Sequence, residues 1–226
     1  MSGRAFLREN SLSLFFFTIF VAAVFGQSLA GWRAHNEEAA AHGSEALSWG
    51  GYVLSPEFGS ALLENWQSEY LQFALFILAT VWLVQRGSNE SKRAEDAGRE
   101  SLRKQRLGYA APPDAPAWAK AGGWRQALYA NSLLLVMGTI FVASWLGQSL
   151  TGLREQNDVR AEHGEPPLSW PEYVGGAEFW ERTLQNWQSE FLAVGSMVVF
   201  TIYLRQRGSP ESKPVGAPHA ETASSG

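Results

Sequence analysis

The stretch Asn10–Gly31, with the sequence NSLSLFFFTIFVAAVFGQSLAG, decides the fold, because the chain repeats it 121 residues later. The second copy, Asn131–Gly152, has the sequence NSLLLVMGTIFVASWLGQSLTG. The register is kept without a gap to two further motifs, NWQSE at 65–69 and 186–190, and QRGS at 85–88 and 206–209. Self-similarity at a fixed spacing indicates a structural unit built twice. The sequence therefore predicts two copies of one helical unit.

Apolar residues are concentrated in four runs, although the mean hydropathy of the whole chain is slightly negative. The first run is uncharged and about 20 residues long, the length a helix needs to cross a ~30 Å hydrocarbon core. The four runs are Ser11–Ala30, Trp66–Val84, Ser132–Thr151 and Trp187–Leu204. We expect an all-α fold, a membrane-embedded four-helix bundle made of two tandem helical hairpins with ordered extracytoplasmic loops.

The apolar runs allow two other interpretations. The start of the chain resembles a cleaved signal peptide, because it combines Arg4 and Arg8, an apolar stretch after them and the small residues of Ser28-Leu29-Ala30. The copy in mid-chain argues against cleavage, because a segment needed there as a span is expected to span at the start too. Buried helices of a soluble protein would need a large core, since runs such as Phe15-Phe16-Phe17 leave little polar face. A chain of 226 residues is too short for such a core.

Lys and Arg are distributed unequally between the predicted loops. Nine lie between Arg86 and Arg125, after the second span, whereas the first outer loop contains only Arg33. Its counterpart contains three, Arg154, Arg160 and Arg182. Cytoplasmic loops carry the excess of Lys and Arg, so both termini and the central linker are predicted to be cytoplasmic. We expect a multi-pass protein of the cell membrane in which both hairpins have the same orientation.

The predicted domains follow the repeat. They are repeat 1 at 1–92, a charged and Pro-rich cytoplasmic linker at 93–124, repeat 2 at 125–213, and a disordered tail at 214–226. Within the linker region, Asn89–Arg106 has a helix-like density of charges of both signs, and Ala110–Trp118 is Pro-rich. We therefore predict a solvated helix followed by a loop.

The outer loops carry helix signals of their own. Span one is expected to continue above the membrane and stop at Gly43, and Ser55-Pro56-Glu57 predicts a new helix start. The second copy lacks this cap. A repeated LSW-x-x-YV pattern, at 47–53 and 168–174, is expected to pack against the overshooting helices; an aromatic surface for a partner or a lipid headgroup is the alternative.

The strongest candidate site comes from polar residues that recur at one level of the predicted bundle. They are Gln27, Asn65, Glu69, Gln148, Asn186 and Glu190. Ionisable residues inside spans are costly and often mark pathways, which would make this a ligand, ion or proton site. Polar residues also join membrane helices by hydrogen bonds. In that second interpretation Arg33 pairs with Glu69, and Arg154 with Glu190, as structural ion pairs.

Other kinds of site find little support. His42 and His163 recur beside glycines but without ligand spacing, so polar loop residues are expected rather than a metal site. The absence of cysteine excludes disulfides, thiolate catalysis and Cys-based metal sites. No phosphate loop, nucleophile elbow or HExxH motif occurs in the sequence, so we predict no enzyme and no cofactor. The net charge of −4 gives no reason to expect nucleic acid.

Both copies combine the same four motifs: GQS-x-x-G at a span end, HG…LSW…YV in the loop, NWQSE at the next span and QRGS-x-ES-K after it. This combination resembles an uncharacterised bacterial membrane-protein family, a domain of unknown function. The resemblance covers both copies and implies a multi-pass membrane protein without an assigned activity. We expect a non-enzymatic scaffold or partner-binding protein in the lipid bilayer, with a homo-oligomer or another membrane protein as partner. The alternative is a small transporter or channel that uses the polar Gln/Asn/Glu level.

Overall fold

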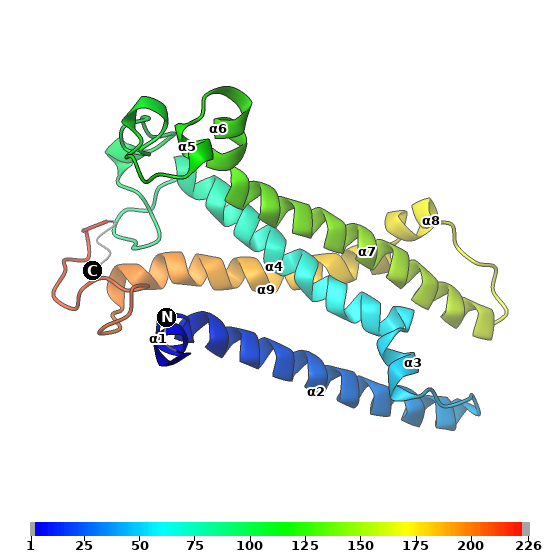
Figure 1. Cartoon of the computed structure of the whole chain (residues 1–226). Coiled ribbons are helices and arrows are strands. Elements are labelled where there is room, and N and C mark those ends of the chain that lie inside the picture. Colours follow the sequence, from blue (N-terminus) through cyan, green and yellow to red (C-terminus); the bar gives the residue numbers. More distant parts are fainter. Residues whose placement is uncertain (1–2, 223–226) are drawn as a thin grey trace. The chain divides into compact units, whose positions relative to one another are not determined.

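The computed structural model describes residues 3–222, and within that range every regular element is helical. Four long helices dominate Figure 1: α2 (Ser11–His42), α4 (Pro56–Trp82), α7 (Ser132–Glu162) and α9 (Ala177–Tyr203). The short elements are α1 (Gly3–Glu9), α3 (Trp49–Val53), α5 (Ala117–Lys120), α6 (Gly123–Ala130), α8 (Trp170–Gly175) and the 3-10 turns η1 (Ala94–Asp96) and η2 (Gly108–Ala110). The predicted all-α class is confirmed.

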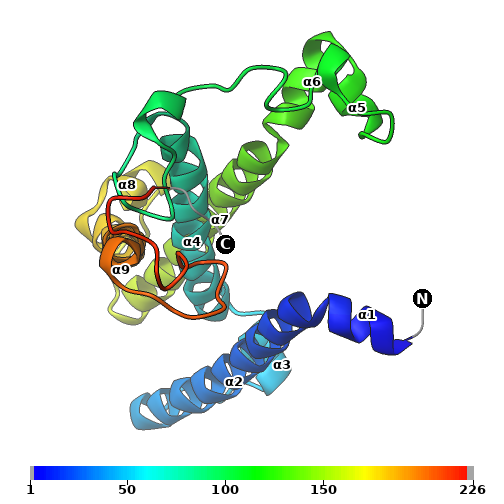
Figure 2. The same cartoon turned by 90° about the vertical axis from the view of Figure 1, so that its left-hand side faces the viewer.

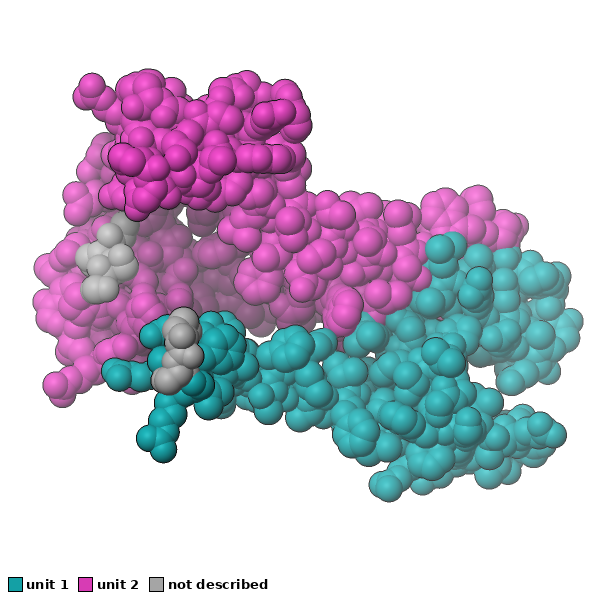
Figure 3. Space-filling model, in the orientation of Figure 1, with its two compact units in different colours: residues 1–62, 150–168 teal, residues 63–149, 169–226 magenta. Residues whose placement is uncertain are grey.

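The chain forms two compact units, which Figure 3 colours separately. Unit 1 comprises residues up to Leu62 together with Leu150–Leu168, and unit 2 comprises Leu63–Ser149 together with the chain from Ser169 onward. Two boundaries between the units therefore fall inside α4 and α7, and the third lies in the loop just before α8. Each unit takes residues from both copies of the repeat, so the compact units do not coincide with the predicted domains 1–92 and 125–213.

Two of the four long helices are apolar enough to cross a membrane. Among the described residues these are α2 and α7, and only 6% of the apolar window of α2 and 17% of that of α7 is buried. Helices α4 and α9 carry Glu69 and Glu190 in mid-helix and end at Trp82 and Tyr203, slightly before the predicted span ends. Helix length and composition therefore support two of the four predicted spans.

The ends of the helices follow local sequence signals. Helix α2 stops at Gly43, whose φ of 72° lies in the left-handed region, and the Ser44 amide donates to the Ala39 carbonyl at 2.8 Å. Helix α4 begins at Pro56, with the Phe58 amide donating to Ser55 Oγ at 3.3 Å. Helix α9 begins after Gly176 without a side-chain cap. These predicted boundaries are confirmed.

The linker differs from the prediction, because 89–106 contains only the 3-10 turn η1 and no α-helix. Side-chain bonds to the backbone hold this region in turns instead: Ser91 Oγ accepts from the Gln85 amide at 2.7 Å and donates to the Lys92 carbonyl at 3.0 Å. Gly87 and Gly98 also adopt positive φ values of 85° and 98°. The predicted solvated helix is therefore wrong, since turn-forming groups override the helix-like charge pattern.

The tail also differs from the prediction, at least over 214–222. Lys213 is buried, and its Nζ donates to the carbonyls of Gly87 at 2.6 Å, Pro218 at 3.2 Å, His219 at 3.1 Å and Glu221 at 3.0 Å. Burial lowers the pKa of Lys213, and the charge of Arg205 acts in the same direction. These bonds fold the tail back beside the loop that follows α4 (Figure 2). Residues 223–226 of the predicted disordered segment lie outside the described residues.

Candidate functional site

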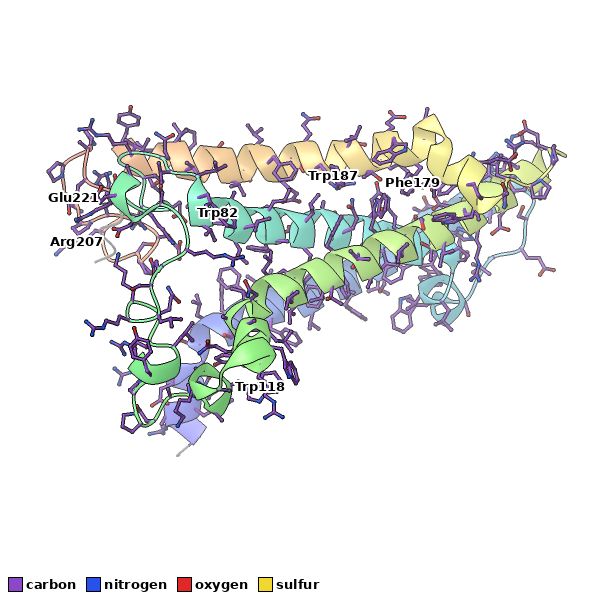
Figure 4. The ribbon with its side chains drawn as sticks, turned by 90° about the horizontal axis from the view of Figure 1, so that it is seen from above. Trp82, Trp118, Phe179, Trp187, Arg207 and Glu221 are labelled. Carbon is purple, nitrogen blue, oxygen red and sulfur yellow. The ribbon has the colours of Figure 1, made fainter. Side chains whose placement is uncertain are left out.

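The two NWQSE segments lie on α4 and α9, and a set of polar side chains joins these helices within unit 2. Asn186 Nδ2 donates to Glu64 Oε1 at 2.9 Å, and Arg182 Nε lies 3.3 Å from Glu64 Oε2. Trp187 Nε1, on the segment labelled in Figure 4, donates to Gln67 Oε1 at 2.8 Å. These contacts connect residues about 120 positions apart in the sequence, and they make a polar interior between α4 and α9.

Helical spacing explains how this interior is built. Glu64, Gln67 and Ser68 are i, i+3 and i+4 and share one face of α4. Arg182, Asn186 and Glu190 follow one another at i+4 spacing on α9. Gln67 and Ser68 are buried, and the Glu64 side chain is only 13% exposed. Buried polar groups are tolerated when they are hydrogen-bonded, so the observed bonds hold this interface together.

Glu190 lies at one end of the polar interior. Ser68 Oγ donates to Glu190 Oε1 at the long distance of 3.5 Å. The half-buried Glu190 carboxylate also experiences electrostatic repulsion from Glu69. Gln67 Nε2 and Thr183 Oγ1 are buried without a hydrogen-bond partner among the described residues. The polar side chains around Glu64 are therefore hydrogen-bonded, whereas Gln67 Nε2 and Thr183 Oγ1 in the same interior lack a hydrogen-bond partner among the described residues.

The structure brings together part of the predicted site. Asn186 and Glu190 are half-buried in unit 2, and Gln148 of α7 is buried in the same unit. Asn65 and Glu69 share a face of α4, as expected, but both are exposed. The Asn and Glu of NWQSE are thus exposed on α4 but half-buried on α9.

Gln27 is half-buried on α2 and belongs to unit 1. Its expected place at the same level as the polar residues of unit 2 stays a prediction.

The expected ion pairs of Arg33 with Glu69 and of Arg154 with Glu190 stay predictions, because each would join a residue of unit 1 to a residue of unit 2. The side chains of Arg33 and Arg154 are exposed. Within unit 2, Arg182 pairs with Glu64, a contact that was not predicted from the sequence. The sequence does contain a signal for this pair, because the two copies of the repeat differ at both positions. The counterparts of Glu64 and Arg182 are Gln185 and Ala61, so each charge occurs in one copy only.

The repeated LSW-x-x-YV loops pack as predicted, with the same contacts in both copies. Trp49 Nε1 donates to Ser28 Oγ at 3.1 Å, and Trp170 Nε1 donates to Ser149 Oγ at 3.0 Å. Asn36 and Asn157 each exchange two hydrogen bonds with the backbone of a loop leucine, Leu47 and Leu168, at 2.7–3.0 Å. The repeat therefore extends from sequence to individual hydrogen bonds.

A second polar cluster in unit 1 was not predicted. His35 Nδ1 lies 2.6 Å from Glu57 Oε2, and the rings of His35 and Tyr52 are 5.7 Å apart. Burial raises the pKa of Tyr52, and the charges of Glu57 and Glu155 raise it further. The counterpart of His35 is Gln156, so this cluster too arises where the repeat is broken.

The histidines considered as metal ligands lie at helix ends. His42 Nδ1 is 2.9 Å from the Glu38 carbonyl oxygen, and His163 Nδ1 is 2.8 Å from that of Val159. Between residues 3 and 222, no group of three or more His, Asp or Glu side chains is arranged to hold a metal ion. Their geometry is that of polar side chains bonded to the last turn of a helix.

A glycine face on α7 gives a further candidate for an interaction site. A Cβ on Gly147 would lie 2.8 Å from Leu63 Cδ1, and a Cβ on Gly59 would lie 3.3 Å from Thr151 Cγ2. The Gly147/Thr151 face of α7 therefore packs closely against the Gly59/Leu63 face of α4. In the first copy, the counterparts of Gly147 and Thr151 are Gly26 and Ala30.

This face of α2 is open. A Cβ on Gly26 would meet nothing within 4 Å, and Ala30 is exposed. The counterparts of Gly59 and Leu63 on α9 are Trp180 and Leu184, which are also exposed. Both faces of the helix contact seen between α4 and α7 thus recur, one on α2 in unit 1 and the other on α9 in unit 2, and each is exposed.

Comparison with known proteins gives one finding about the family. The sequence model of a family described as "Domain of unknown function (DUF6766)" matches residues 3–224. No curated protein and no solved structure matches the chain.

Proposed function

Because the chain belongs to the DUF6766 family, a domain of unknown function, we propose its function from its geometry. The proposal is a multi-pass membrane scaffold, without enzymatic activity, that assembles with a second copy of itself. The open glycine face of α2 is the surface through which it assembles. The observation that carries the proposal is that the same face of the repeat is closely packed on α7 and open on α2.

Membrane insertion accounts for the exposed apolar surface. A core helix of a soluble protein is mostly buried, whereas α2 and α7 bury very little of their apolar windows. Helix α7 lies in mid-chain, where a signal sequence does not occur. The repeat supports α4 and α9 as the second span of each hairpin, and the excess of Lys and Arg in the linker supports cytoplasmic termini.

Helix contacts in membranes depend on close packing rather than on the hydrophobic effect, because lipid tails are as apolar as leucine. Small residues at the contact let the two helix backbones approach. The Gly26/Ala30 face of α2 supplies such a surface, and the Trp180/Leu184 face of α9 supplies the larger side chains to cover it. If α2 of each copy packs on α9 of the other, the contact closes as a two-fold dimer.

The absence of native cysteine makes this contact directly testable. We expect a chain carrying Gly26→Cys and Leu184→Cys to form an intermolecular disulfide on mild oxidation in membranes, seen as a dimer-sized band. The control pair, Phe17→Cys with Leu184→Cys, places the first thiol on the opposite face of α2, since nine residues correspond to about 900° of helical rotation. It should give at least about tenfold less dimer. A disulfide confined to one chain, or equal dimer from both pairs, would contradict the proposed assembly.

The bonded polar interior of unit 2 fits a scaffold, because its Asn186–Glu64, Arg182–Glu64 and Trp187–Gln67 contacts hold α4 to α9. A transporter or channel is the second candidate. It is favoured by the half-buried Glu190, which experiences electrostatic repulsion from Glu69, and by the buried, unpartnered Gln67 Nε2 and Thr183 Oγ1. These groups could serve a permeating ion or proton.

The two candidates predict different results for Glu69→Gln combined with Glu190→Gln. A pathway requires loss of ion or proton flux into proteoliposomes while thermal unfolding stays within a few degrees of the parent chain. A scaffold predicts no specific flux from the parent chain and an unchanged yield of the Gly26–Leu184 crosslink in the variant. Flux from the parent chain that the double substitution abolishes would favour the second candidate.

A further inference from the structure

A pocket of about 410 Å³ lies beside the loop that follows α4, within unit 2. One wall is formed by Arg86 and by the turn carrying Arg93 and Glu95, and the other by the tail residues Ala220, Glu221 and Thr222. We call it the tail pocket. Figure 4 labels Glu221 at the same end of unit 2 as Trp82, the last residue of α4.

Hydrogen bonds hold the tail side of the tail pocket in place. Lys213 Nζ binds the carbonyls of Gly87 and Glu221, and the Gly87 amide donates to Thr222 Oγ1 at 2.8 Å. The tail comes so close that a Cβ on Gly87 would lie 2.3 Å from the His219 carbonyl oxygen. Gly87 also has a φ of 85°, so glycine is required there for both reasons. The backbone at Glu221 and Thr222 is therefore held beside Gly87, the residue after Arg86, by hydrogen bonds.

The charged groups around the pocket are of both signs. Arg86 and Arg93 are exposed, and neither forms an ion pair among residues 3–222; the same is true of the carboxylates of Glu95 and Glu221. The remaining cation, Lys92, is held by the Gly98 carbonyl at 3.3 Å and by Glu100 at 3.5 Å. Two arginines and two glutamates thus line one pocket without an ion pair among the described residues.

These groups define the ligand chemistry. Arginine forks bind phosphate oxygens in a bidentate manner, and a carboxylate accepts hydrogen bonds from a primary ammonium group. Trp82 and the end of α4 would lie at the membrane–water interface, where aromatic residues gather at headgroup level. From this we infer that the tail pocket binds a lipid headgroup carrying both a phosphate and a primary ammonium group, of the phosphoethanolamine type. The inference rests on the proposed membrane location of α4.

The test uses the full chain purified in detergent, with lipid binding measured by native mass spectrometry. We expect phosphatidylethanolamine to bind at least about tenfold better than phosphatidylcholine, whose quaternary ammonium has no N–H donor. Arg86→Gln with Arg93→Gln should reduce phosphatidylethanolamine binding by about tenfold or more. Glu95→Gln with Glu221→Gln should remove the discrimination between the two lipids. The control Arg207→Gln changes an exposed arginine outside the pocket and should leave binding unchanged.

Soluble probes separate a headgroup site from a site for free phosphate. O-phosphoethanolamine should compete with the lipid, and inorganic phosphate should compete more weakly. Three results would overturn the inference. They are equal binding of phosphatidylethanolamine, phosphatidylcholine and phosphatidylglycerol, a preference for phosphatidylglycerol, and full competition by inorganic phosphate. Alkaline extraction of membranes and the Gly26–Leu184 crosslink report on the proposed scaffold independently, so failure of one proposal can be distinguished from failure of the other.

Discussion

Replacing Arg182 with leucine is expected to destabilise the chain by about 3 kcal/mol, the lower end of the range for breaking a buried ion pair by removing one partner. The Glu64 side chain is only 13% exposed, and Arg182 is 29% exposed. Without Arg182, the Glu64 carboxylate loses a positive charge 3.3 Å away while remaining largely out of water. The measurement is chemical unfolding of the protein in detergent, followed by tryptophan fluorescence and circular dichroism.

A double substitution separates the lost charge from lost packing. Arg182→Leu combined with Glu64→Leu removes both charges, and we expect it to recover most of the loss, to within about 1 kcal/mol of the parent chain. Arg160→Leu is the matched control, because its partner Glu165 is 53% exposed and such a pair contributes at most about 1 kcal/mol. Equal losses from Arg182→Leu and Arg160→Leu would show that the Glu64 pair is not a buried interaction.

Local signals explain why much of the helical structure could be predicted. The stop at Gly43 and the start at Pro56 depend on backbone groups within a few residues, and both appear where the sequence places them. The apolar runs likewise predict the cores of the long helices. The helix predicted in the linker is wrong for a related reason. Gly87, Ser91 and Gly98 favour turns locally, and this preference outweighs the helix-like pattern of charges around them.

The candidate site depends on information that a local pattern does not contain. The spacing of NWQSE correctly places Asn65 and Glu69 on one face of a helix, but which face turns inward depends on how α4 is rotated against α9. The repeat encouraged an expectation of two equivalent sites. The charged contacts form instead where the copies differ, between Glu64 and Arg182 and between His35 and Glu57. Departures from the repeat were therefore a better guide to these two contacts than the repeat itself.

The aromatic contacts around Phe179 give the largest expected effect of a single substitution. The ring is fully buried within unit 2, with centroids 5.7 Å from Trp145, 5.5 Å from Tyr173 and 5.6 Å from Trp180. Figure 4 labels Phe179 near the start of α9. Because its neighbours come from α7, α8 and α9, truncation would leave a cavity that no single helix can fill. Phe179→Ala should therefore cost about 3–5 kcal/mol in unfolding free energy.

Phe200→Ala is the matched control for this prediction, since it makes the same chemical change on the same helix at a ring that is 54% exposed. In detergent it should cost about 0.5 kcal/mol or less, because little packed volume is removed. Phe200 lies on the segment predicted as the fourth span, so in a bilayer its exposed ring would meet lipid, whereas Phe179 keeps its ring contacts in either medium. A Phe200→Ala loss as large as that of Phe179→Ala would mean that Phe200 is packed against another helix, and would contradict its exposure in the structure.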